Sequence, residues 1–142
     1  MSNEPETIQS MLSDSKVIAV VGMSDKDTRA SYHIGVYLAK HGYRVIPVNP
    51  MVKSINGETC HPDLDSAQAA ALAAHGQGID LVNVFRASEN VPPIVDDVIR
   101  LGIRSLWLQD GVAHSESVAK AEAAGVKCVQ NDCIYRRHAE ME

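Results

Sequence analysis

The chain has 142 residues, of which 45% are hydrophobic and 22% are charged, and these fractions indicate one globular domain rather than a disordered, collagen-like or coiled-coil protein. Thirteen basic and eighteen acidic residues give a net charge of -5, which argues against a nucleic-acid or anionic-membrane partner. The three cysteines form no C-x-x-C pair, no apolar run is long enough to span a membrane, and the start of the chain is polar and acidic. We therefore expect a cytoplasmic protein without a disulfide framework or a zinc site.

Five short apolar segments predict the strands of a sheet. The first, Val17 to Val21, is a mostly β-branched run that ends at Gly22 and is typical of a central parallel strand buried on both faces. The others follow in chain order: Arg44 to Val48, Leu81 to Phe85, Ser105 to Leu108 and, more weakly, Lys127 to Gln130.

Helical patterns separate these strands. The clearest has apolar residues at spacing i, i+3, i+4, i+7, i+8, which makes one stripe on a helix: Val91, Ile94, Val95, Val98 and Ile99. The other predicted helices are Ser31 to Lys40, an alanine-rich surface helix over Ala67 to Gly78, Ser115 to Ala124, and a terminal helix after Cys133.

A glycine followed by an apolar residue recurs between helix and strand. Gly42, Gly102 and Gly125 have this position, and Gly78 is predicted as a fourth case. Glycine readily takes the left-handed conformation that ends a helix. This alternation predicts an α/β fold, a Rossmann-like, doubly wound and mainly parallel five-stranded sheet with helices on both faces, as a single domain over residues 1–142.

Ligands of such sheets bind outside the carboxyl ends of the strands, and the first strand ends in the richest polar segment. Residues 22–29 combine a glycine turn, hydroxyls and the cations Lys26 and Arg29, and they lead into a predicted helix that Asp27 or Thr28 is expected to cap. A helix start of this kind favours an anion such as phosphate. An ordinary β-to-α turn is the alternative interpretation.

A dinucleotide fingerprint is incomplete at this turn. The three glycine places of G-x-G-x-x-G hold Gly22, Ser24 and Asp27. The acid that holds a ribose diol in NAD proteins is also missing, because residues 41–57 contain no Asp or Glu. Arg44, Asn49 and Lys53 stand there instead, which favours an NADP-like or 3′-phospho-ADP group over NAD. A Walker P-loop is absent.

These segments, in this order, resemble the small CoA-binding proteins related to the CoA-binding domain of the succinyl-CoA synthetase alpha chain. The resemblance extends from Lys16 to Cys133, and its carriers are VVGMS at 20–24, RASY at 29–32, GYRVIPVNP at 42–50, GETC at 57–60, DLVNVFRASE at 80–89 and LWLQDGV at 106–112.

The resemblance implies that CoA lies across the strand ends. Gly22, Met23 and Ser24 would approach the pyrophosphate, Asn49 and Pro50 would lie beside the nucleotide, and Phe85 and Arg86 would shape the pocket. Lys26, Arg29 and Lys53 are candidates for phosphate contacts on charge and position alone. Ala30 departs from the proline usual in the family.

The sequence predicts no catalytic residue and no metal site. Its six histidines are scattered along the chain, whereas a catalytic histidine must be paired with a base or a nucleophile. We therefore expect non-covalent binding of CoA or an acyl-CoA by a protein that is not an enzyme. Cys133 could form a mixed disulfide with CoA if it lies near the strand ends.

Two alternatives remain open at this point. One is an NADP-binding redox or sensor protein. The other is a noncatalytic regulatory subunit that docks on a partner enzyme, for which the segment Ala67 to Gly78 would be the contact surface; an oligomer is compatible with either.

Overall fold

Five parallel strands form the central sheet, in the spatial order β2-β1-β5-β6-β7. This computed structural model describes residues 2–141. The strands are β1 (Val17–Val21), β2 (Arg44–Val48), β5 (Leu81–Val84), β6 (Ser105–Leu108) and β7 (Lys127–Val129). All five residues of β1 are buried. The predicted strands are confirmed, although β5 and β7 each end one residue earlier than expected.

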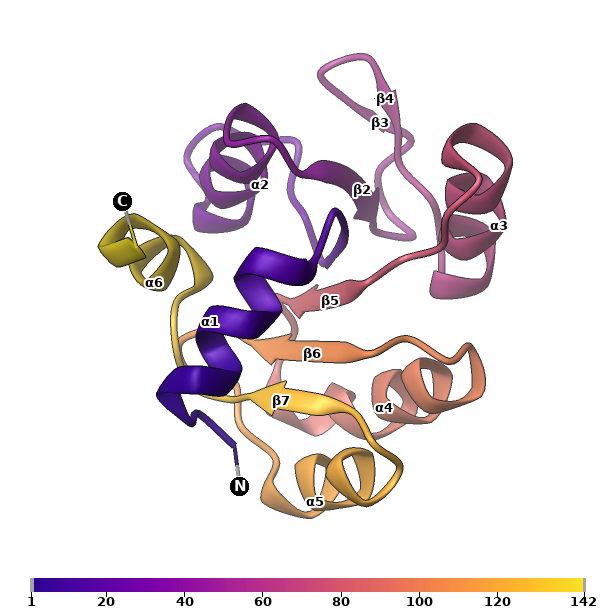
Figure 1. Ribbon diagram of the computed structural model, residues 1–142. Helices are drawn as coiled ribbons and strands as arrows, with labels where there is room; N and C mark the ends of the chain where they lie inside the picture. The colour runs from indigo at the N-terminus through magenta and orange to yellow at the C-terminus, as the bar shows by residue number, and fades with distance from the viewer. Residues whose placement is uncertain (1, 142) are drawn as a thin grey trace.

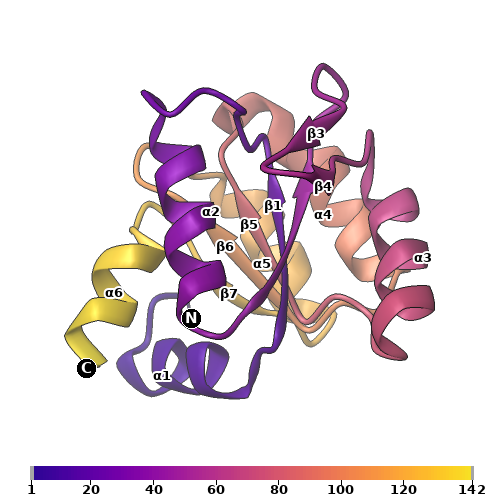
Figure 2. The same cartoon turned by 90° about the horizontal axis from the view of Figure 1, so that it is seen from above.

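Helices cover both faces of the sheet, as Figures 1 and 2 show. Side chains alternate along a strand, so Ile18 and Val20 face one core while Val17, Ala19 and Val21 face the other. The first core is covered by α1 (Pro5–Asp14), α2 (Ala30–Lys40) and α6 (Ile134–Met141); the second is covered by α3 (Leu64–His75), α4 (Val91–Arg100) and α5 (Ser115–Ala123). The predicted doubly wound α/β fold is therefore confirmed.

The direction of winding reverses between β1 and β5. The chain passes from β1 outward to β2, which is an edge strand, and then crosses back over β1 to β5 before continuing to β6 and β7. Neighbouring strands whose connections run in opposite directions leave a crevice at their carboxyl ends, the topological switch point. The turns after β1 and β5 therefore border the place where ligands of this architecture bind.

Three of the four predicted glycine helix ends are confirmed. Gly42, Gly102 and Gly125 have φ values of 95°, 70° and 91°. The apolar residue after each glycine donates its N–H to the last helical turn, as in Ile103 N to Val98 O at 3.0 Å. The prediction for Gly78 is wrong: α3 ends at His75, and Gly76, with a φ of 66°, takes the left-handed position instead.

Helix α3 begins earlier than the alanine-rich run suggested. Asp63 caps it, because the carboxylate Oδ1 accepts the N–H of Ser66 at 2.8 Å. This cap extends the helix toward the N-terminus. The helix is also part of the core rather than only a surface feature, since Leu64, Ala67 and Ala71 are buried.

Four further elements were not predicted. Helix α1 precedes the sheet, and the short 3-10 helix η1 (Ser88–Asn90) precedes α4. The strands β3 (Ser54–Ile55) and β4 (Glu58–Thr59) form an antiparallel hairpin after β2. Its turn consists of Asn56 and Gly57, both with positive φ, which is the backbone that the type I′ hairpin turn requires.

Candidate functional site

The turn after β1 lies directly against the end of β5. Gly22 has a φ of 86°, and its N–H donates to Val48 O at 2.7 Å. A Cβ built on Gly22 would stand 2.7 Å from the carbonyl oxygen of Phe85. Only glycine satisfies both the backbone conformation and this close approach. The predicted glycine turn therefore lies at the switch point.

A cleft of about 390 Å³ opens beside this turn and is here called the switch-point cleft. It brings together five of the predicted site residues with the start of α2; the lining is Gly22, Ser24, Lys26, Arg29, Ala30, Ser31 and Phe85. Lys26 and Arg29 are exposed, and within residues 2–141 neither side chain has an ion-pair partner. The cleft is therefore bordered by two positive charges that form no ion pair within residues 2–141.

The backbone donors of the cleft differ from those expected. Ser24 N–H donates to Ser31 Oγ at 3.0 Å, and the N–H of Gly22 is already bound to Val48. Two of the three turn amides are thus used by the protein itself, which leaves Met23.

The start of α2 supplies other amides. Its N-cap residue is Arg29, and no side chain caps it, so the expected cap by Asp27 or Thr28 is wrong. The amides of Ala30, Ser31 and Tyr32 have no intrahelical acceptor, because the first helical hydrogen bond is donated by His33 N–H to Arg29 O. The positive end of the α2 dipole therefore lies at the switch-point cleft.

Asn49 connects the strand ends instead of projecting freely. Its Nδ2 donates to Met23 O at 3.0 Å, and its Oδ1 accepts the N–H of Met51 at 2.9 Å. Its backbone N–H donates to His61 O at 2.8 Å. Lys53 is exposed beside the β3–β4 hairpin. The loop after β2 is thereby held against the turn after β1.

Arg86 does not line the switch-point cleft. Its side chain and Pro50 line a separate cleft of about 240 Å³, together with Val48 and the carboxylates Asp63 and Asp97. A Cβ on Gly22 would stand 3.2 Å from Arg86 Cδ. Phe85 and Arg86 are consecutive, but they border different clefts.

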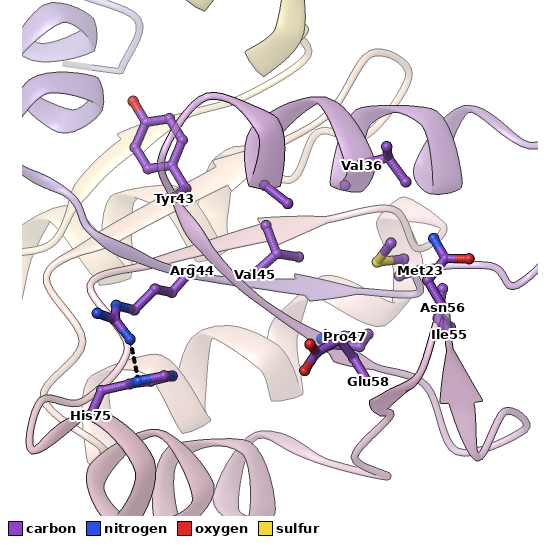
Figure 3. Close-up of a pocket in the computed structure, with 12 residues that line it drawn as sticks. Met23, Val36, Tyr43, Arg44, Val45, Pro47, Ile55, Asn56, Glu58 and His75 are labelled. Carbon is purple, nitrogen blue, oxygen red and sulfur yellow. Dashed lines mark hydrogen bonds between the residues drawn. The ribbon is translucent and has the colours of Figure 1, made fainter.

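Met23 turns its side chain toward a third cavity, of about 290 Å³, that runs along the edge strand β2 (Figure 3). Its side chain is 4% exposed and packs against Gly35 of α2, where a Cβ would stand 2.8 Å from the Met23 sulfur. Sequence reasoning missed this cavity, because its lining comes from α2, β2, the hairpin and the end of α3 and forms no motif.

The three cysteines are buried. Burial raises the pKa of the Cys60 thiol and raises that of Cys128 to about 12. Cys133 is 7% exposed and belongs to the core beside Trp107 and Ile134. None of these thiols lines the switch-point cleft.

A cluster of metal-ligating side chains and a membrane-spanning helix are both absent from residues 2–141. No group of three or more His, Cys, Asp or Glu side chains in this range is placed to hold a metal ion. No helix in the same range has both the length and the apolar character needed to cross a membrane.

Solved structures share the fold. A hypothetical protein from Pyrococcus horikoshii OT3 superposes with a TM-score of 0.83 and is 31% identical, covering 96% of this chain and 91% of that chain. A protein from Thermus thermophilus, cell-free ID.343, superposes with a TM-score of 0.83 at 27% identity, covering 98% of this chain and 99% of that one.

Proteins of similar amino-acid sequence match most of the chain. The uncharacterized protein YneT of Bacillus subtilis is 31% identical over 132 residues, which are 93% of this chain and 92% of YneT. The ADP-forming acetate–CoA ligase I of Archaeoglobus fulgidus is 25% identical over 136 residues, which are 89% of this chain but 19% of the ligase. A family model described as CoA binding domain matches residues 16–139. The chain therefore belongs to the CoA-binding domain family.

Proposed function

We propose that the protein binds CoA or an acyl-CoA non-covalently, with the phosphates in the switch-point cleft. The observation that carries the proposal is that Lys26, Arg29 and the uncapped start of α2 border one cleft. Cations and helix N-terminal amides stabilise phosphate together. The residues present therefore fit a ligand with several phosphates, and family membership favours CoA among such ligands.

The segment around the end of β2 favours a ligand whose ribose carries a phosphate. No Asp or Glu stands in residues 41–57, so no carboxylate of this segment would repel that phosphate. Lys53 is the exposed cation of the loop that follows. We assign to it a contact with the 3′-phosphate of CoA. An NADP 2′-phosphate would suit the same charge, so NADP is the competitor that the test must include.

The protein itself performs no reaction on CoA in this proposal. Its thiols are buried and none lines the switch-point cleft, so a mixed disulfide between Cys133 and CoA requires the core to open. The acetate–CoA ligase match covers only a fifth of that enzyme. We propose that a cytoplasmic domain of this kind hands its ligand to a separate partner enzyme or acts within an oligomer.

Native mass spectrometry of the protein as purified, followed by thermal unfolding with added ligand, tests the proposal. We expect a co-purified mass equal to CoA or an acyl-CoA. We also expect stabilisation by added CoA of about 2.7 kcal/mol at a free concentration one hundred times Kd. Stabilisation by NADP or NAD without stabilisation by CoA contradicts the proposal.

A further inference from the structure

The outer edge of β2 is covered along only part of its length. Arg44 N–H donates to Lys16 O at 2.8 Å and Val48 O accepts from Gly22 at 2.7 Å, so these residues face β1. In a strand that pairs in this register, the backbone groups of Val45 and Pro47 point to the outer edge. His61 covers Pro47, because its N–H donates to Pro47 O at 2.9 Å.

Val45 is left open. In the part of the chain that the structure describes, its backbone N–H and C=O have no hydrogen-bond partner on the outer edge. An edge strand with unpaired backbone groups is a template for a further strand. Pro47 lacks an N–H and limits any such pairing to the stretch before it.

The open edge lies in the cavity of Figure 3, here called the β2-edge groove. Val36 and Ala39 of α2 form one wall, and Ile55 of the hairpin forms part of the other. Val45 and Pro47 contribute the strand itself. An apolar groove along a strand with free backbone groups is the surface that an extended peptide recognises by strand addition.

The two ends of the groove carry opposite charges. At the start of β2, Arg44 Nη1 lies 2.6 Å from Nδ1 of His75. At the other end, Glu58 lines the groove beside Pro47 (Figure 3). Neither Arg44 nor Glu58 has an ion-pair partner among residues 2–141.

These charges define the direction of the bound chain. A peptide antiparallel to β2 runs from Pro47 toward Arg44, which brings a C-terminal carboxylate to the Arg44 guanidinium and leaves the preceding residues near Glu58. A parallel peptide would bring an N-terminal ammonium to Arg44, which is repulsive. From Arg44 to Pro47 the strand extends about 10 Å, the length of three residues.

We propose that the β2-edge groove binds the extended C-terminal tripeptide of a partner polypeptide, antiparallel to β2. One residue of that peptide exchanges both backbone hydrogen bonds with Val45. Its apolar side chains pack against Val36 and Ile55, and its terminal carboxylate pairs with Arg44. This surface is separate from the switch-point cleft and does not require the protein to bind CoA.

The probe is a pool of pentapeptides with Ala, Val, Leu or Ile at every position and a free C-terminal carboxylate. The protein is labelled with ¹⁵N, and exchange and chemical shift of the Val45 amide are measured. We expect the pool to slow exchange of this amide about tenfold and to shift its resonance. The same pool with amidated C-termini should bind about tenfold more weakly, because the charge-assisted hydrogen bond is lost.

Matched variants locate the carboxylate. Arg44→Gln should lower the affinity for the peptides with a free carboxylate about tenfold and leave the affinity for the amidated peptides unchanged. Arg104→Gln removes an exposed cation at the amino end of the sheet, outside the groove. It should change the affinity for neither peptide pool. Comparison of the two pools on the unmodified protein keeps the test valid if a variant folds poorly.

Three results overturn the proposal. The first is an unchanged Val45 amide at millimolar peptide. The second is equal affinity for the carboxylate and amidated pools. The third is slow, concentration-dependent exchange of Val45 without peptide, which would mean that a second copy of the chain covers this edge.

Discussion

Gly22 and Phe85 hold the ends of β1 and β5 in contact at the switch point. A Cβ at Gly22 would stand 2.7 Å from Phe85 O, while the N–H of Phe85 donates to Val21 O at 2.8 Å. The absence of one carbon atom thus lets the two strand ends meet, and the switch-point cleft is built on that meeting.

Substitution of Gly22 by alanine should destabilise the protein through both φ and steric contact. Gly57→Ala is the matched control, because Gly57 has nearly the same φ, 82° against 86°, with nothing within 4 Å of its Cβ. We expect Gly57→Ala to lower the free energy of unfolding by about 1 kcal/mol and Gly22→Ala by about 3 kcal/mol. Urea unfolding measures both, and equal losses would show that the contact with Phe85 imposes no constraint.

Removal of the positive charges at the switch-point cleft should weaken the binding of CoA without unfolding the protein. Lys26 and Arg29 are exposed and form no ion pair with the residues that the structure describes, so their substitution by glutamine breaks no such pair. We expect each change to reduce CoA affinity about tenfold and to reduce its dependence on salt. Lys40→Gln, at the far end of α2, is the control. Unchanged affinity in Lys26→Gln and Arg29→Gln would place the phosphates elsewhere.

Asn49→Ala should act mainly on stability. The change leaves Met23 O and Met51 N–H without their partner, which we expect to lower the free energy of unfolding by about 1–3 kcal/mol. Asn90→Ala is the control, because Asn90 is exposed and its side chain does not cap α4. Thermal unfolding compares the two variants. If Asn49→Ala were as stable as the parent, the hydrogen bonds of this side chain would not stabilise the fold, and a direct contact with the ligand would be the remaining role of Asn49.

Asn83 is a polar residue whose replacement by leucine should stabilise the protein. It is 0% exposed in β5, between Val20 and Trp107, and neither its Oδ1 nor its Nδ2 has a partner among residues 2–141. Because an unpartnered buried amide is costly, we expect Asn83→Leu to raise the free energy of unfolding by about 1 kcal/mol.

Gln109→Leu is the opposite case. Gln109 is also buried, but its Oε1 accepts the N–H of Ile134 at 2.9 Å, so its replacement should destabilise the protein. Chemical denaturation of both variants gives the comparison. A loss of stability in Asn83→Leu would instead reveal that a buried water satisfies the amide.

Cys128 should make folding sensitive to alkaline pH. Burial raises the pKa of its thiol from 9.0 to about 12 in the folded protein, while the unfolded chain ionises near the ordinary value. The stabilising contribution is therefore complete below about pH 9 and is lost as the pH rises toward 12. Between pH 8 and pH 11, Cys128→Ala should lose stability less steeply than the parent. Parallel pH profiles of unfolding would contradict this assignment.

The sheet could be predicted because its strands are apolar runs between helical patterns. The hairpin was missed, although Asn56-Gly57 is a strong turn signal, because strands of two residues show no alternation. Helix α1 was missed because its buried residues Ile8, Met11 and Leu12 stand in a mostly polar segment.

The site could be predicted only in part. The glycine turn, Lys26 and Arg29 follow from their place after the first strand, whereas Phe85 was implied by the family resemblance. The pairing of Ser24 N–H with Ser31 Oγ, and of Asn49 with Met23, depends on how loops distant in sequence pack together. No local pattern reports such contacts, so the sequence did not reveal that the N–H groups of Gly22 and Ser24 already have protein acceptors.

Isothermal titration calorimetry with CoA and with NADP, at one ionic strength, tests the central claim most directly. We expect saturable binding of CoA at one site per chain and binding of NADP about tenfold weaker or more, a difference of about 1.4 kcal/mol. No binding of CoA, or binding of NADP as tight as that of CoA, would contradict it.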